Sequence, residues 1–252
     1  MDYPENHLAE FVSTLQDYSK RMANYFTKIQ TEYTSRSNDF FKSIKDAFDS
    51  IPEALKQLSG VGWYMSMHMG PGEINGLARL INEGNIEKVD RYLVDHFQKN
   101  YNQIKNNLII KYPERKQILT SAFNAHERKD YYASIPLCLS QADGMCFDLT
   151  GKRPYRSKRK IPETALIADK FKKGSILNYF LQPLTVQGLI NANQDERENF
   201  KGIINRHEIL HGISLNYGTE IDGFKAISWL NYIGEVLEIV ISEDTKLGQT
   251  KT

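Results

Sequence analysis

Apolar side chains recur at steps of three and four residues along most of the chain, and this spacing constrains the fold more than any other feature. A helix places such residues on one face, whereas a half-buried strand needs strict alternation. No alternating stretch of useful length occurs. The clearest helical stripe, between residues 6 and 33, consists of Leu8, Phe11, Leu15, Tyr18, Met22, Tyr25 and Ile29. The sequence therefore predicts an all-α protein.

Glycine, proline and capping residues divide the remaining pattern into helices. We expect helices over residues 40–48, 52–60, 73–83, 86–111, 118–123, 134–146, 163–173, 175–182, 184–192, 195–213 and 220–242. The stretch 60–72 holds almost no charge and is rich in Gly, Trp, Tyr and Met, which predicts a buried connection between helices. Gln141 and Asp143 interrupt an apolar helix, and they either form its polar face or point toward a site.

Composition excludes several classes of protein. The formal net charge is +1, so the chain as a whole is neither acidic nor basic and local patches must carry any electrostatic effect. No run approaches ~18 apolar residues, so no membrane-spanning helix is expected. The N-terminal sequence MDYPENHLAEF lacks the pattern of a secretory signal. Cys138 and Cys146 lack metal-ligand spacing and are expected in the core. We expect a cytoplasmic protein without a cofactor.

One basic segment stands out between residues 151 and 162. Six of the nine positions from 152 to 160 are cationic: Lys152, Arg153, Arg156, Lys158, Arg159 and Lys160. Such a run is either a solvated loop or a contact for a nucleic-acid backbone, with Tyr155 available to stack on a base.

The segment Asn205-Arg206-His207-Glu208-Ile209-Leu210-His211-Gly212 can be interpreted as two different sites. On a helix, His207 and His211 lie about 40° apart and both should face a packed environment. They could bind zinc, with Glu208 as general base of a peptidase. The pattern lacks a third downstream histidine, so a carboxylate such as Glu220 or Glu235 would have to complete the site.

Arg206 and His211 form the alternative pair, which suits metal-independent RNA cleavage. Histidine can activate the ribose 2′-hydroxyl or protonate the leaving oxygen, and arginine matches the charge of the phosphorane. On one helix Arg206 points about 140° away from His211. Two copies related by a two-fold axis would supply two of each residue to one cleft, which predicts a homodimer.

The string Asn205-Arg206-His207-x-x-x-His211-Gly212, followed by Tyr217-Gly218-Thr219 and a long helix, resembles the HEPN superfamily, whose signature is R-x4-6-H. The upstream run from Tyr131 to Gly144 is similar to the preceding core helix of such proteins. The resemblance implies a C-terminal helical domain over 114–252, after an N-terminal helical region over 1–113. It also implies RNA as substrate and, in toxin–antitoxin, abortive-infection and antiphage systems, an antitoxin or partner defence protein.

The same resemblance implies roles for four residues. Arg206 would stabilise the phosphate, His211 would transfer protons, His207 would orient the site or contact RNA, and Asn205 would act similarly. Glu208 departs from the signature and keeps the zinc peptidase open. Some HEPN proteins do not cleave RNA, so a non-catalytic RNA-binding or regulatory helical module is the third hypothesis.

Overall fold

The computed structural model describes residues 22–24, 37–66, 68–192, 194–200, 202 and 204–249. The chain divides into two compact units, Met1–Phe48 and Asp49–Thr252. Most of the predicted stripe between residues 6 and 33 lies outside the described residues. The helix α2 (Ser37–Asp49) closes the first unit, and everything below concerns the second.

Within the described residues the fold is all-α, as predicted. The long helices are α3 (Ile51–Gly60), α4 (Pro71–Asn82), α5 (Ile86–Lys111), α6 (Lys116–Glu127), α7 (Tyr131–Thr150) and α11 (Glu220–Gln249). The short ones are α8 (Ala165–Ala168), α9 (Ile176–Phe180) and α10 (Arg206–Leu210). One antiparallel hairpin joins β1 (Ser157–Lys158) to β2 (Ile161–Pro162). No described helix is long and apolar enough to span a membrane.

Two predicted helices are wrong, and a third, over 163–173, is reduced to the four residues of α8. Residues 186–192 follow a 3₁₀ turn (Gln182–Thr185) without helix, and the predicted helix over 195–213 shrinks to a 3₁₀ turn (Gln194–Asn199) and the five residues of α10. The backbone explains the break, because Gly202 has a φ of 146° and Asn205 is extended, at φ −140° and ψ 127°. Asparagine in this conformation starts a helix and does not continue one. The helix α10 is therefore held by loops on both sides.

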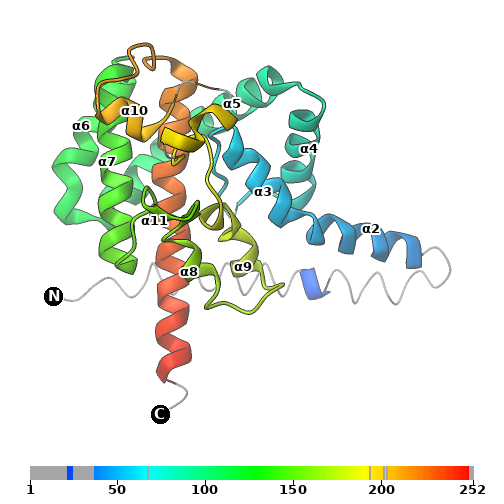
Figure 1. Cartoon of the computed structure of the whole chain (residues 1–252). Helices are drawn as coiled ribbons and strands as arrows, with labels where there is room; N and C mark the ends of the chain where they lie inside the picture. The colour runs from blue at the N-terminus through cyan, green and yellow to red at the C-terminus, as the bar shows by residue number, and fades with distance from the viewer. Residues whose placement is uncertain are drawn as a thin grey trace. The chain divides into compact units, whose positions relative to one another are not determined.

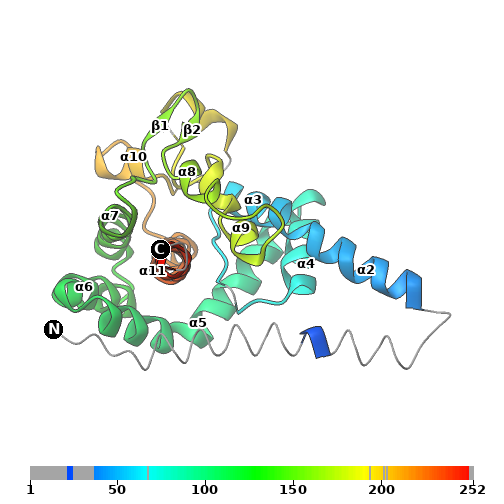
Figure 2. The same ribbon diagram turned by 90° about the horizontal axis from the view of Figure 1, so that it is seen from below.

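The helix α11 forms the centre of the second unit (Figures 1 and 2). It packs most extensively on α7 and also on α5, and α6 in turn packs on α7 and α5. Its buried apolar residues are Phe224, Ala226, Ile227, Trp229, Leu230, Tyr232, Ile233, Val236, Leu237 and Ile239. A helix whose side chains are apolar over most of its circumference belongs in a core. The helices α5 and α6, which precede and follow residue 113, pack on each other. The domain boundary predicted at residue 113 stays a prediction.

The connection from Gly62 to Ser66 is buried, as the composition of the stretch 60–72 predicted, but His68 in the same stretch is exposed. Trp63, Tyr64 and Met65 are almost completely inaccessible. The indole Nε1 of Trp63 donates a hydrogen bond of 2.7 Å to Asp90 on α5. The ammonium group of Lys225 on α11 lies 3.1 Å from the same carboxylate oxygen. This buried ion pair joins α5, α11 and the connection between α3 and α4.

A proline inside α7 leaves one backbone carbonyl of this helix free to accept a hydrogen bond from the segment after α10. The helix begins at Tyr131, three residues before the predicted start, with Asp130 as its N-cap. Pro136 has no N–H to give to the Tyr132 carbonyl four residues earlier. The hydroxyl of Tyr217 donates to that carbonyl instead, at 3.2 Å. Gly218 also lies against the Tyr132 ring, where an added Cβ would come within 2.3 Å.

Burial of His126 on α6 predicts a loss of stability in acid. Its ring contacts Tyr101, Tyr131 and Phe224, and its Nδ1 has no hydrogen-bond partner among the described residues. Burial lowers the pKa of His126 from 6.5 to about 4. The unfolded chain therefore takes up this proton first, and the free energy of unfolding should fall by about 3 kcal/mol as the pH drops from 6.5 to 4.

Urea unfolding at pH 7 and at pH 4.5 measures this loss. Carboxylates also titrate in this range, so wild type is compared with His126→Phe, which keeps an aromatic ring. The variant should lose less stability between the two pH values by about 2–3 kcal/mol. Equal losses in both proteins would show that His126 does not contribute.

Candidate active site on helix α10

The helix α10 is fixed from its first residue by Asn205. The Asn205 side chain accepts a hydrogen bond from the Glu208 N–H at 3.1 Å. Its amide group donates to the carbonyls of Leu189 and Ala192, both at 3.0 Å, and the residue is 1% exposed. The Asn205 side chain thus forms its hydrogen bonds with the backbone of the protein, and these bonds position α10.

Glu208 anchors the other side of the helix through Arg197, a residue that sequence reasoning missed. The Arg197 Nε donates to the Glu208 carboxylate at 3.1 Å. The same guanidinium also donates to the carbonyls of Phe200 and Gly202. Glu208 therefore holds the loop 197–202 against α10. Among the described residues, no three His, Cys, Asp or Glu side chains lie close enough together to hold a metal ion.

The two histidines lie side by side at the end of α10. Their ring centroids are 4.4 Å apart. His207 is partly buried, but His211 is exposed, so the expectation that both face a packed environment is wrong for His211. The reason is that α10 ends at Leu210 and the chain turns at Gly212, with a φ of 70°. Burial, followed by the charges of His211 and Arg206, lowers the pKa of His207. His207 is therefore neutral at neutral pH.

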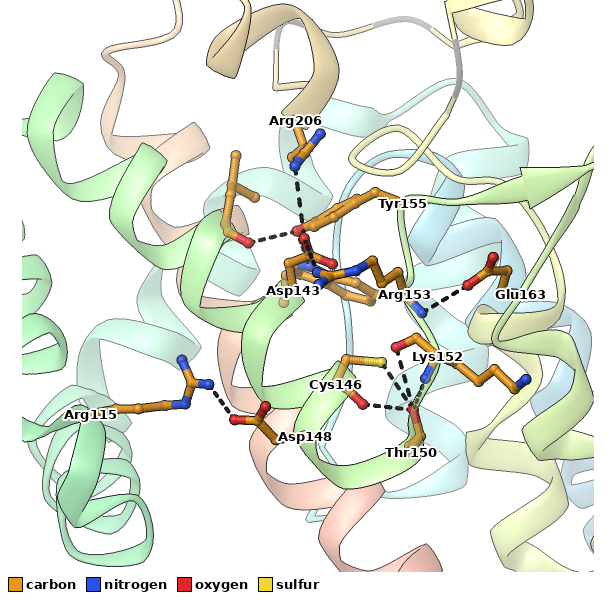
Figure 3. A network of polar contacts seen from close by, with 12 residues as sticks. Arg115, Asp143, Cys146, Asp148, Thr150, Lys152, Arg153, Tyr155, Glu163 and Arg206 are labelled. Carbon is orange, nitrogen blue, oxygen red and sulfur yellow. Dashed lines mark hydrogen bonds and ion pairs between the residues drawn. The ribbon is translucent and has the colours of Figure 1, made fainter.

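Arg206 points toward α7 and meets Asp143 there (Figure 3). Its Nη2 lies 3.8 Å from Asp143 Oδ2, and Arg153 approaches the same oxygen at 3.1 Å. Asp143 thus points toward the site, which was one of the two interpretations of a polar residue in this helix. The Arg206 guanidinium also lies over the ring of Tyr155, 5.1 Å from its centroid.

Two hydrogen bonds to core residues hold the Tyr155 hydroxyl. Its hydroxyl donates to the Leu139 carbonyl at 3.1 Å and accepts from Trp229 Nε1 at 2.6 Å. Burial raises the pKa of Tyr155 well above its usual value. The ring supports Arg206, and this contact occupies one face of the ring.

The six predicted cations of the basic segment separate into three groups. Lys152 and Arg153 are partly buried beside α7, where Arg153 lies over the Phe147 ring at 4.3 Å. Arg156, Lys158 and Arg159 are exposed around the β1–β2 hairpin. Lys160 forms an ion pair with Glu196 at 2.5 Å, which links the hairpin to the 3₁₀ turn before α10.

Comparison of the chain with protein-family models, curated proteins and solved structures finds no match.

Proposed function

We propose that the protein is a metal-independent endoribonuclease of the HEPN type that acts as a toxin or antiphage effector. One observation carries the proposal. Arg206 and His211 lie at the two ends of a short helix that Asn205 and Glu208 anchor from both sides. The arginine is beside a second guanidinium, and the histidine is exposed to an incoming substrate.

In this proposal one histidine takes the proton of the ribose 2′-hydroxyl, and the 2′-oxygen attacks the neighbouring phosphorus. The bond from phosphorus to the 5′-oxygen breaks, and that oxygen receives a proton from solvent water. Arg206 stabilises the charge that builds up on the phosphorane. The products are a 2′,3′-cyclic phosphate and a 5′-hydroxyl. Neutral His207 orients His211 or accepts a hydrogen bond from RNA.

The placement of the pair supports a site shared by two chains. Arg206 and His211 are five residues apart, about 7.5 Å along a helix axis, and Arg206 is turned toward α7. Large apolar side chains at the end of α10 and in the segment that leads into α11 are exposed: Leu210 by 39%, Ile213 by 56%, Leu215 by 73% and Ile221 by 38%. A second copy of the chain that covers this surface would bring its own His211 to the site.

The hairpin gives the proposed substrate a second contact. Arg156, Lys158 and Arg159 are exposed, and β1–β2 follows directly from the loop that carries Arg153. In a chain of nearly balanced charge, this is the segment suited to neighbouring phosphates of an RNA strand. An antitoxin or partner defence protein would restrain the enzyme by covering the same surface.

The test is cleavage of single-stranded RNA by the purified protein in EDTA, with product ends identified by mass spectrometry. We expect 2′,3′-cyclic phosphate ends and full activity in the chelator. Near-stoichiometric zinc in the protein, with peptidase activity that EDTA removes, would support instead the site formed by His207, Glu208 and His211. Tight RNA binding without any cleavage would favour the non-catalytic module.

A further inference from the structure

Two guanidinium groups from separate segments converge on one carboxylate next to α10. Arg206 belongs to α10 and Arg153 to the loop after α7, and both face Asp143 Oδ2 (Figure 3). The Asp143 side chain is 13% exposed, whereas those of Arg153 and Arg206 are 34% and 27% exposed. The carboxylate is therefore the inner member of the group, and the two cations are open to solvent.

The hydrogen bonds of this group are incomplete on the Arg206 side. Arg153 donates to Asp143 at 3.1 Å, but Arg206 remains at 3.8 Å, beyond hydrogen-bond distance. The Arg206 Nε and the Asp143 Oδ1 have no hydrogen-bond partner among the described residues. Asp143 thus attracts Arg206 by charge without using up its donors.

From this arrangement we propose that Arg153 and Arg206 bind the same scissile phosphate, and that Asp143 is the positioning residue that keeps them together. Two arginines and one aspartate carry a net charge of +1, which one phosphodiester neutralises. Without the carboxylate, the two guanidiniums would repel each other. The proposal rests on the proposed ribonuclease function and adds to it a second phosphate-binding residue and its support.

The surroundings of the cluster fix both arginines in this geometry. The Tyr155 ring lies under Arg206, and the Phe147 ring lies under Arg153. The backbone N–H of Arg153 also donates to Glu163 at 3.3 Å. Arg153 is thus held by contacts with Asp143, Phe147 and Glu163, whereas Arg156, Lys158 and Arg159 are exposed, and it suits the reacting phosphate better than they do.

Asp143→Asn tests the positioning role, because it removes the charge and keeps the shape. We expect kcat for RNA cleavage to fall about 10- to 100-fold, with a smaller change in KM and an unchanged pH profile. Asp143→Glu, which keeps the charge, should retain more activity than Asp143→Asn. The matched control is Asp148→Asn on the same helix, since Asp148 also pairs with an arginine, Arg115, but away from α10.

Arg153→Gln tests the phosphate contact independently of cleavage. Affinity for 2′-O-methyl RNA, which cannot be cleaved, is measured against salt concentration. Loss of one phosphate contact should reduce the slope of log K against log salt by about 0.7. The control Arg128→Gln removes an exposed cation at the end of α6 and should leave the slope unchanged.

Each outcome decides one of the two proposals. Equal activity of Asp143→Asn and Asp148→Asn, or a wild-type slope for Arg153→Gln, would overturn the shared phosphate site. A wild type that cleaves no RNA would overturn the ribonuclease while the slope of Arg153→Gln still tests the contact. If circular dichroism shows that Asp143→Asn does not fold, the salt dependence of RNA binding by Arg153→Gln alone tests the shared phosphate site.

Discussion

Arg206→Ala and His211→Ala are each expected to lower the rate of RNA cleavage by about 10²- to 10³-fold. In the proposed mechanism Arg206→Ala removes the cation from the developing phosphorane, and loss of one such stabilising donor has an effect of that size. His211→Ala removes a proton-transfer group, which typically contributes about 10²- to 10⁴-fold. Arg206→Lys should not restore the rate, because an ammonium lacks the planar fork that matches phosphate. Single-turnover cleavage of a short labelled RNA gives these rates.

Two controls accompany this prediction. Glu208→Gln should be far milder than Arg206→Ala, because in the proposed ribonuclease Glu208 only anchors α10 through Arg197. The reverse order would favour the zinc peptidase. Mixed dimers of Arg206→Ala and His211→Ala chains hold one intact Arg206 and one intact His211, on different subunits. Recovery of activity in the mixture would show a shared site, whereas its absence would place the working pair within one chain.

Asp90→Asn is expected to destabilise the second unit by about 3–5 kcal/mol. The substitution removes the carboxylate 3.1 Å from Lys225, whose side chain is only 7% exposed, and breaking a buried pair from one side has a cost of this size. The amide oxygen can still accept from Trp63, so the loss reports the charge. Urea unfolding followed by tryptophan fluorescence measures the change in the free energy of unfolding.

The same helix supplies a matched control. Asp95→Asn breaks the exposed pair of Asp95 with Lys99, at 2.6 Å, and should change stability by less than about 1 kcal/mol. A double variant, Asp90→Asn with Lys225→Met, should recover part of the loss because the buried cation that faced Asp90 is then removed as well. Similar losses for Asp90→Asn and Asp95→Asn would contradict a special role for the buried pair.

The long helices could be predicted from the sequence because their apolar spacing and their end signals agree. The start of α11 shows this agreement. Thr219 accepts from the Asp222 N–H at 3.1 Å and donates to its carboxylate at 2.7 Å, next to the predicted start at Glu220. The region before α10 could not be predicted in the same way. Its helical spacing is overridden by Gly202 and Asn205, whose backbone conformations interrupt a helix.

Only part of the candidate site was visible in the sequence. The spacing of Arg206 and His211 marked α10, but Arg153 and Asp143 come from different segments and meet Arg206 only through the packing of α10 on α7. As a polar residue in an apolar helix, Asp143 could be predicted to point toward a site. Nothing in the sequence around Arg197 indicated that it would anchor Glu208. The exposure of His211 depends on where α10 ends, and the apolar pattern put that end three residues too late.

The tip of the β1–β2 hairpin shows a conflict between stability and charge. Arg159 and Lys160 both have positive φ, 52° and 69°, a backbone region that an Asn-Gly pair occupies with far less strain. Such a pair would make a more stable protein, yet two long cations occupy the turn. Replacing Arg159 and Lys160 with such a pair should therefore raise the stability of the protein, but it would remove two cations from the surface that we propose as an RNA contact.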